Sequence, residues 1–118
     1  MSLSHPPSNM TSPHLPPHLL IVDDEESLRE MLEILFAAEG YVIDVAADGA
    51  QALDRLRHQA YDLILTDMRM PGADGLQLLE QVKQLHPETL VILMTAYSTT
   101  AQAVEAMKLG AYDYIVKP

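Results

Sequence analysis

Acidic side chains and one lysine stand where short apolar runs end along this chain of 118 residues. Asp23 and Asp24 follow the first run, Asp67 follows the third, the fourth ends at Thr95, and Lys117 follows the last. If the fold brings these ends together, three carboxylates repel one another, and the pKa of at least one rises unless a divalent cation is bound. Because the ligand atoms on offer are all oxygens, Mg²⁺ is the cation that fits best.

Each of these residues also has a plainer interpretation. The run Asp23–Glu26 can be the acidic first turn of a helix, favoured by the helix dipole, with Ser27 and Glu30 as a capping box. Asp67 can be a turn former before the Pro-Gly pair at 71–72. The threonine and the lysine can be a strand residue and a solvated charge. Their common position at strand ends is what favours a functional site.

Short aliphatic runs alternate with segments of helical periodicity from Leu19 onward, which is typical of βα units and a parallel sheet. Strands are predicted at Leu19–Val22, Val42–Ala46, Leu63–Thr66, Leu90–Thr95 and Tyr114–Val116. One helix is predicted to end before Gly40, and others lie near Gly49–His58, Gly75–His86 and Thr100–Leu109. The inward-facing residues are expected to be Leu28, Met31, Leu32, Leu35 and Phe36, then Ala52, Leu53 and Leu56, then Leu78, Val82 and Leu85, and finally Val104 and Met107. The last helix, with few large apolar residues, should hold the core weakly.

Right-handed crossovers between these elements predict an α/β fold with a doubly wound, five-stranded parallel sheet in the flavodoxin-like order 2-1-3-4-5. In such sheets, ligands bind outside the carboxyl ends of the strands. The acidic residues, the threonine and the lysine therefore converge on one crevice.

Composition limits the classes of function. Seven Lys and Arg against seventeen Asp and Glu give a net charge of −10, which argues against direct binding of nucleic acid by this domain. The chain has no Cys, so disulfides, thiol nucleophiles and cysteine zinc sites are excluded. No apolar run approaches the roughly eighteen residues of a membrane span, and no secretory signal is recognisable, so we expect a cytoplasmic domain.

Residues 1–18 form a Pro- and His-rich segment without formally charged side chains, so we expect an extended N-terminal tail ahead of one domain at 19–118. Its histidines at 5, 14 and 18 are irregularly spaced, which favours a solvated tail over a metal site.

Four motifs resemble the receiver domain of bacterial two-component response regulators. They are LLIVDD at Leu19–Asp24, LILTDMRMPGADG at Leu63–Gly75, VILMTA at Val91–Ala96 and GAYDYIVKP at Gly110–Pro118. All fall in the order and spacing of that family. The run DMRMPG at 67–72 and the run MTAYS at 94–98 look most like the nitrogen-regulation class, whose members are sigma-54-dependent activators.

The resemblance implies that Asp67 is a phosphoacceptor that attacks a phosphohistidine of a partner sensor histidine kinase. It implies Mg²⁺ held by Asp24 directly, by Asp23 through water, by Asp67 and by the backbone carbonyl of Arg69. Receiver domains of this kind are phosphorylated themselves rather than acting as enzymes on other substrates.

By the same resemblance, Lys117 pairs with the phosphoryl oxygens and Thr95 donates a hydroxyl hydrogen bond to one of them. Thr95 and Tyr114 form the conformational switch that reports phosphorylation. The output domain, expected to be a sigma-54-type ATPase with a DNA-binding domain, lies outside these residues.

Receivers resembling this one carry a fifth helix after the Lys-Pro pair, whereas this chain stops at Pro118. We therefore expect Ile115 or Val116 and part of the first helix to be exposed. The N-terminal tail, anchored by Leu15, Leu19 and Leu20, or a second copy in a homodimer would cover them.

Two other classes share parts of this pattern. A flavodoxin would need hydrogen-bond donors for a phosphate after the first strand, where this chain offers carboxylates. A phosphatase that forms an aspartyl phosphate typically has a second aspartate two residues beyond the first, where this chain has Arg69.

Overall fold

A computed structural model describes residues 15–70, 74–96 and 99–118. Strands and helices alternate along the chain. In order they are β1 (His18–Val22), α1 (Glu26–Ala38), β2 (Val42–Ala46), α2 (Gly49–His58), β3 (Leu63–Asp67), α3 (Gly75–Leu85), β4 (Leu90–Thr95), α4 (Thr100–Lys108) and β5 (Asp113–Val116). The predicted strands agree with these bounds to within one residue.

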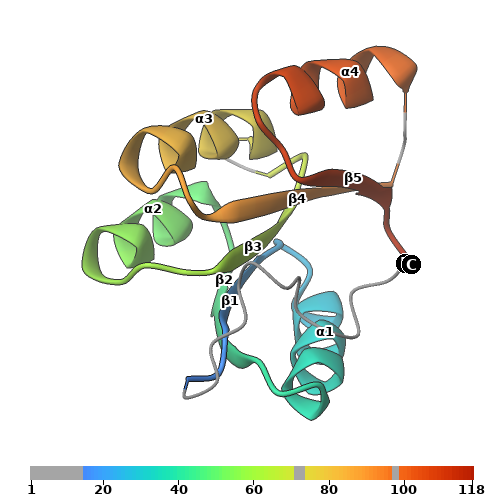
Figure 1. Ribbon diagram of the computed structural model, residues 1–118. Coiled ribbons are helices and arrows are strands. Elements are labelled where there is room, and N and C mark those ends of the chain that lie inside the picture. Colours follow the sequence, from blue (N-terminus) through green and yellow to red (C-terminus); the bar gives the residue numbers. More distant parts are fainter. Residues whose placement is uncertain (1–14, 71–73, 97–98) are drawn as a thin grey trace.

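The strands form one parallel sheet in the order β2-β1-β3-β4-β5, as predicted (Figure 1). Leu19 of β1 pairs with Leu63 of β3, and Leu63 pairs with Leu90 of β4, so the central strands lie nearly level. Because all strands run in one direction, their carboxyl ends meet at one edge of the sheet.

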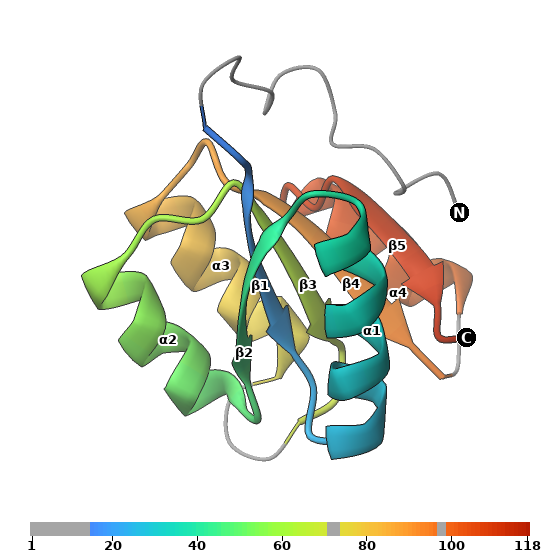
Figure 2. The same ribbon diagram turned by 90° about the horizontal axis from the view of Figure 1, so that it is seen from below.

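Side chains alternate between two apolar layers, one on each face of the sheet. Leu19 and Ile21 face α1, where they pack in one cluster with Leu32 and Phe36. Leu20 and Val22 belong to the cluster on the other face, which contains the buried residues of α2, α3 and α4. Figure 2 shows α1 on one side of the sheet and α2 and α3 on the other. The strands are therefore covered on both faces.

Several inward-facing predictions for the helices were wrong. Met31 and Leu35 of α1 are 40% and 54% exposed, and only Leu32 and Phe36 of its apolar stripe are buried. In α3, Leu85 is exposed and Leu79 is buried in its place. In α4 the predicted anchors Val104 and Met107 are about half exposed, and Ala106 alone is buried. The helices rest on the sheet through narrower stripes than their periodicity suggests.

The start of α1 also differs from the capping-box interpretation. Glu25, rather than Ser27, is the N-cap residue, and its side chain makes no capping hydrogen bond. By contrast, Asp74 caps α3 in a complete capping box with Gln77. The acidic run at the end of β1 therefore serves no side-chain capping role at α1.

Residues 1–14 of the N-terminal tail and the Pro-Gly turn at 71–72 lie outside the described residues, and so does any cover that the tail provides. Of the proposed anchors, Leu15 is 70% exposed, whereas Leu19 and Leu20 are buried within β1 itself. Exposure on β5 follows the expectation in part, since Val116 is 58% exposed and Ile115 packs partly on the α1 face. None of the described helices is both long and apolar enough to cross a membrane.

Candidate phosphoacceptor and metal site

Backbone hydrogen bonds hold the site together at the carboxyl edge of the sheet. The N–H of Asp23 donates to Ala46 O at 3.1 Å, which fixes the end of β1 against β2. At the other side of the sheet, the N–H of Lys117 donates to Thr95 O at 2.8 Å. The lysine thus leaves β5 beside the last residue of β4, with its side chain directed back over the centre of the sheet.

Lys117 is the centre of an ion-pair network. Its Nζ lies 3.0 Å from Asp23 Oδ2, from Asp67 Oδ2 and from Glu25 Oε1. The pairs with Asp67 and Glu25 are aligned hydrogen bonds. The side chains of Asp23, Asp67 and Lys117 are 0%, 8% and 11% exposed, whereas that of Glu25 is 59% exposed. The predicted convergence of Asp23, Asp67 and Lys117 is therefore present, with Glu25 as a fourth member.

Burial and ion pairing act in opposite directions on the charged groups of this network. Desolvation raises the pKa of the Asp23 carboxyl, and the hydrogen bond from Glu25 N–H and the nearby ammonium of Lys117 oppose that rise. Burial by itself lowers the pKa of Lys117, but its interactions with the carboxylates of Asp23, Glu25 and Asp67 more than compensate and raise it above its ordinary value. Lys117 therefore stays charged, and it partly neutralises the carboxylates around it.

The loop between β1 and α1 is preorganised. Asp23 Oδ1 accepts a hydrogen bond of 2.9 Å from the backbone N–H of Glu25. The guanidinium of Arg29, one turn into α1, donates to the carbonyl oxygen of Asp23 at 2.6 Å. These two bonds fix the carboxylate of Asp23 and place Glu25 over Lys117.

The residues present suit a divalent cation bound by oxygens. Asp23 Oδ2 is buried and has no aligned hydrogen-bond donor among the described residues, although Lys117 Nζ is close to it. Carboxylate oxygens of Asp23, Asp24 and Glu25 lie within 4.8 Å of one another. Asp24 is exposed, so a hydrated ion can reach it. A hard cation that keeps some of its waters, such as Mg²⁺, matches this donor set.

Asp67 sits at the end of β3 with its carboxylate tied on both sides. Arg69 donates its backbone N–H to Asp67 Oδ1 at 3.3 Å, and Lys117 holds Oδ2. Gly75, the first residue of α3, packs against this turn so closely that an added Cβ would stand 2.6 Å from Asp67 O. The glycine allows α3 to approach the backbone behind the acidic residue.

The two predicted switch residues lie on the neighbouring strands β4 and β5. Thr95 is 3% exposed at the end of β4, one strand away from Asp67. Tyr114 of β5 is half-buried, and its hydroxyl donates to Gln102 Oε1 of α4 at 3.4 Å. A change at Tyr114 can therefore reach α4 directly.

Sequence reasoning missed two of these contacts. It placed Glu25 in the acidic run but gave it no partner, because the pair with Lys117 joins residues 92 positions apart. It did not single out Gln102, since a polar residue on a helix gives no sign of its partner on a strand. Tyr97, two residues beyond Thr95, lies outside the described residues.

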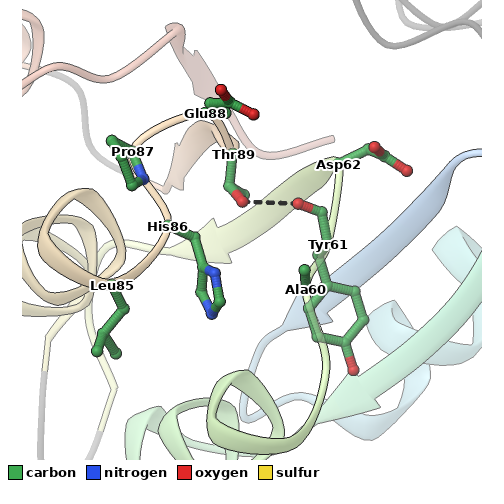
Figure 3. A pocket seen from close by; sticks show the side chains of 8 residues that line it. All are labelled: Ala60, Tyr61, Asp62, Leu85, His86, Pro87, Glu88 and Thr89. Atoms are coloured by element: carbon green, nitrogen blue, oxygen red, sulfur yellow. Dashed lines mark hydrogen bonds between the residues drawn. The ribbon is translucent and has the colours of Figure 1, made fainter.

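A pocket of about 460 Å³ lies at the opposite, amino-terminal edge of the sheet (Figure 3). Two of its polar side chains are bonded within the protein: Thr89 Oγ1 donates to Tyr61 O at 2.6 Å, and His86 Nε2 lies 2.9 Å from Leu56 O. This pocket joins the loops before β3 and β4 and contains none of the predicted site residues.

Solved structures support the fold. A CheY-like response regulator receiver domain protein from Methanospirillum hungatei matches with a TM-score of 0.84 and 30% identity, covering 88% of this chain and 83% of that one. The response regulator TrrA from Thermotoga maritima, solved in complex with Mg²⁺ and BeF, has a TM-score of 0.78 and 35% identity over 86% of this chain and 87% of that one.

Curated relatives are similar over the same region. Over 100 residues, or 85% of this chain, the transcriptional regulatory protein ZraR of Escherichia coli is 45% identical. The DNA-binding transcriptional regulator NtrC of Escherichia coli is 46% identical over 98 residues, or 83% of this chain. The matched regions amount to 23% and 21% of those proteins. The model of the response regulator receiver domain family matches residues 19–118, and the chain belongs to that family.

Proposed function

We propose that this domain is a phosphoacceptor that takes a phosphoryl group onto Asp67 from a phosphohistidine of a sensor histidine kinase. The observation that carries the proposal is the position of Lys117, whose ammonium lies 3.0 Å from an oxygen of the largely buried Asp67 carboxylate. A cation at that distance can neutralise a phosphoryl group placed on Asp67. The domain would act on itself, as the acceptor of a signal rather than as an enzyme with turnover.

The transfer is an in-line displacement at phosphorus. A carboxylate oxygen of Asp67 attacks the phosphorus, and the P–N bond breaks with its electron pair going to the ring nitrogen. The other ring nitrogen of the phosphohistidine carries a proton, so the imidazole leaves as a neutral ring. The protein supplies position and charge: β3 fixes the nucleophile, Arg69 N–H and Lys117 orient its two oxygens, and Thr95 donates to a phosphoryl oxygen.

The proposal includes Mg²⁺ as cofactor. Asp24 would bind it directly, Asp23 through water, and Asp67 with the backbone carbonyl of Arg69 would complete the protein ligands. When bound, the ion neutralises charge on the phosphoryl oxygens. The buried Asp23 Oδ2 without an aligned donor is the feature of the chain that supports this.

We propose that the output is a conformational change through Thr95, Tyr114 and α4. The bond from Tyr114 to Gln102 and the small buried area of α4 support α4 as the moving element. The motifs at 63–75 and 91–96 favour a sigma-54-type ATPase with a DNA-binding domain as the output, and transcription as the regulated process. Since the phosphohistidine donor is made from ATP, the domain would work in the cytoplasm.

Acetyl phosphate with Mg²⁺ tests the proposal, because a small donor replaces the kinase. We expect intact mass to rise by one phosphoryl group per chain, and the group to be lost slowly without turnover of other phosphate esters. Multiple turnover on a phosphorylated small molecule would instead assign the chain to phosphatases that form an aspartyl phosphate.

A further inference from the structure

Once the site is phosphorylated, Lys117 would have more hydrogen-bond acceptors around it than its three N–H donors can satisfy. An ammonium offers three donors, and in this structure three carboxylates lie 3.0 Å from Lys117 Nζ, two of them, Glu25 and Asp67, as aligned hydrogen bonds. A phosphoryl oxygen on Asp67 adds a further acceptor at the same place. The phosphoryl oxygens would therefore compete with these carboxylates for the donors of Lys117.

The three carboxylates differ in how easily they can leave. Asp23 is fully buried and is fixed by the backbone N–H of Glu25. Asp67 carries the phosphoryl group itself. The Glu25 side chain is 59% exposed, has no capping bond to α1, and loses little when it turns into water. Of the three carboxylates, Glu25 therefore has the least to lose on leaving Lys117.

Resting on the proposed function, we infer that Glu25 is a positioning residue which holds Lys117 over the site before phosphorylation and competes with the phosphoryl group for it. Its carboxylate keeps the ammonium in place, close to the acceptor. The same negative charge opposes an anion that enters the site. Glu25 thus sets how tightly the site holds a phosphoryl group, without touching the phosphorus.

Beryllofluoride, a non-covalent stand-in for the phosphoryl group, provides the test with the chain at saturating Mg²⁺. We expect Glu25→Gln to bind beryllofluoride about two- to fivefold more tightly than the parent, the range for releasing one exposed ion pair. The half-saturating concentration of acetyl phosphate should fall by a similar factor, with little change in the maximal rate. A change in folding alone would not lower the half-saturating concentration while leaving the maximal rate unchanged.

Glu26→Gln is the matched control, since it removes the same charge from the neighbouring residue, which is exposed and forms no ion pair among the described residues. It should bind beryllofluoride like the parent. Glu25→Ala removes the acceptor completely and should tighten binding at least as much as Glu25→Gln.

Two results would overturn the inference. Equal affinities of Glu25→Gln and Glu26→Gln for beryllofluoride would show that Glu25 does not compete with the phosphoryl group. Weaker binding of both Mg²⁺ and beryllofluoride by Glu25→Gln would show that Glu25 is a metal ligand instead. In either case Asp67→Asn should still abolish labelling by acetyl phosphate. If Asp67→Asn labels normally, the proposed function itself fails.

Discussion

Lys117 provides the positive charge that compensates the acidic residues of the site. It is a nearly buried cation that faces two buried carboxylates and one exposed carboxylate, and its raised pKa shows that the anions outweigh its burial. Removing one charge from such a network destabilises the protein, because the remaining buried charges lose their compensation. The same arrangement keeps the Lys117 ammonium beside Asp67, close to the position where phosphoryl oxygens would develop charge.

Replacing the lysine tests this balance. Lys117→Met should destabilise the Mg²⁺-free domain by about 3 kcal/mol, because Asp23 and Asp67 would remain buried without their cation. Urea unfolding in the presence of a chelator measures the loss. Lys108→Met, at an exposed position on α4, should change the free energy of unfolding by no more than about 0.5 kcal/mol. Equal effects of both substitutions would contradict the network.

Metal binding should appear as stabilisation. Adding Mg²⁺ at ten times its dissociation constant should raise the free energy of unfolding by about 1.4 kcal/mol. Asp24→Asn should reduce that gain, since it removes a ligand charge, while relieving repulsion in the metal-free domain. Thermal melts with and without Mg²⁺ measure both effects, and a domain whose melting does not respond to Mg²⁺ would argue against a formed site.

At the scale of elements, the strands of the sheet were predictable because apolar runs and the turn residues that bound them are local features of the sequence. Aliphatic runs bounded by turn residues gave all strands within one residue, and Gly40 and Gly110, both at positive φ, mark the ends of α1 and α4. Which face of each helix is buried was less predictable, as Met31 and Val104 show. A stripe records only apolar spacing, whereas the tilt of the helix on the sheet decides which of its residues are covered.

The contact between α3 and β3 predicts the effect of a single methyl group. In Gly75→Ala the new Cβ would meet Asp67 O at 2.6 Å and Met68 Cα at 2.9 Å, and backbone atoms cannot move away cheaply. We expect a loss of about 1–3 kcal/mol in stability together with slower labelling by acetyl phosphate.

Gly40→Ala provides the comparison for that variant. Gly40 has a φ of 96° and no atom within 4 Å of an added Cβ, so the substitution costs about 1 kcal/mol through backbone strain alone. Its labelling rate should match that of the parent. Slower labelling in both variants would mean that lower stability, rather than a displaced Asp67, is the cause.

The whole molecule carries a net charge of −10, and ion pairs outside the site do little to offset it. In the described part of the chain, the remaining pair is His58 with Asp54, at 4.0 Å and largely exposed. Mutual repulsion of the acidic groups therefore works against the compact state, and against any approach to the phosphates of nucleic acid.

Salt should accordingly stabilise the metal-free domain. Raising monovalent salt from low to physiological concentration screens this repulsion, and we expect a gain on the order of 1 kcal/mol in urea unfolding. Sodium and potassium chloride should act alike, because screening does not depend on the identity of the ion. A loss of stability with salt, or measurable binding to duplex DNA, would contradict this account of the surface.

The measurement that bears most directly on the central claim is the site of labelling by acetyl phosphate and Mg²⁺, read by intact mass. The parent and Asp54→Asn, which changes an exposed carboxylate on α2, should each gain one phosphoryl group. Asp67→Asn should gain none, because the nucleophile at the end of β3 is lost. Labelling of Asp67→Asn at the rate of the parent would contradict the assignment of Asp67 as the phosphoacceptor.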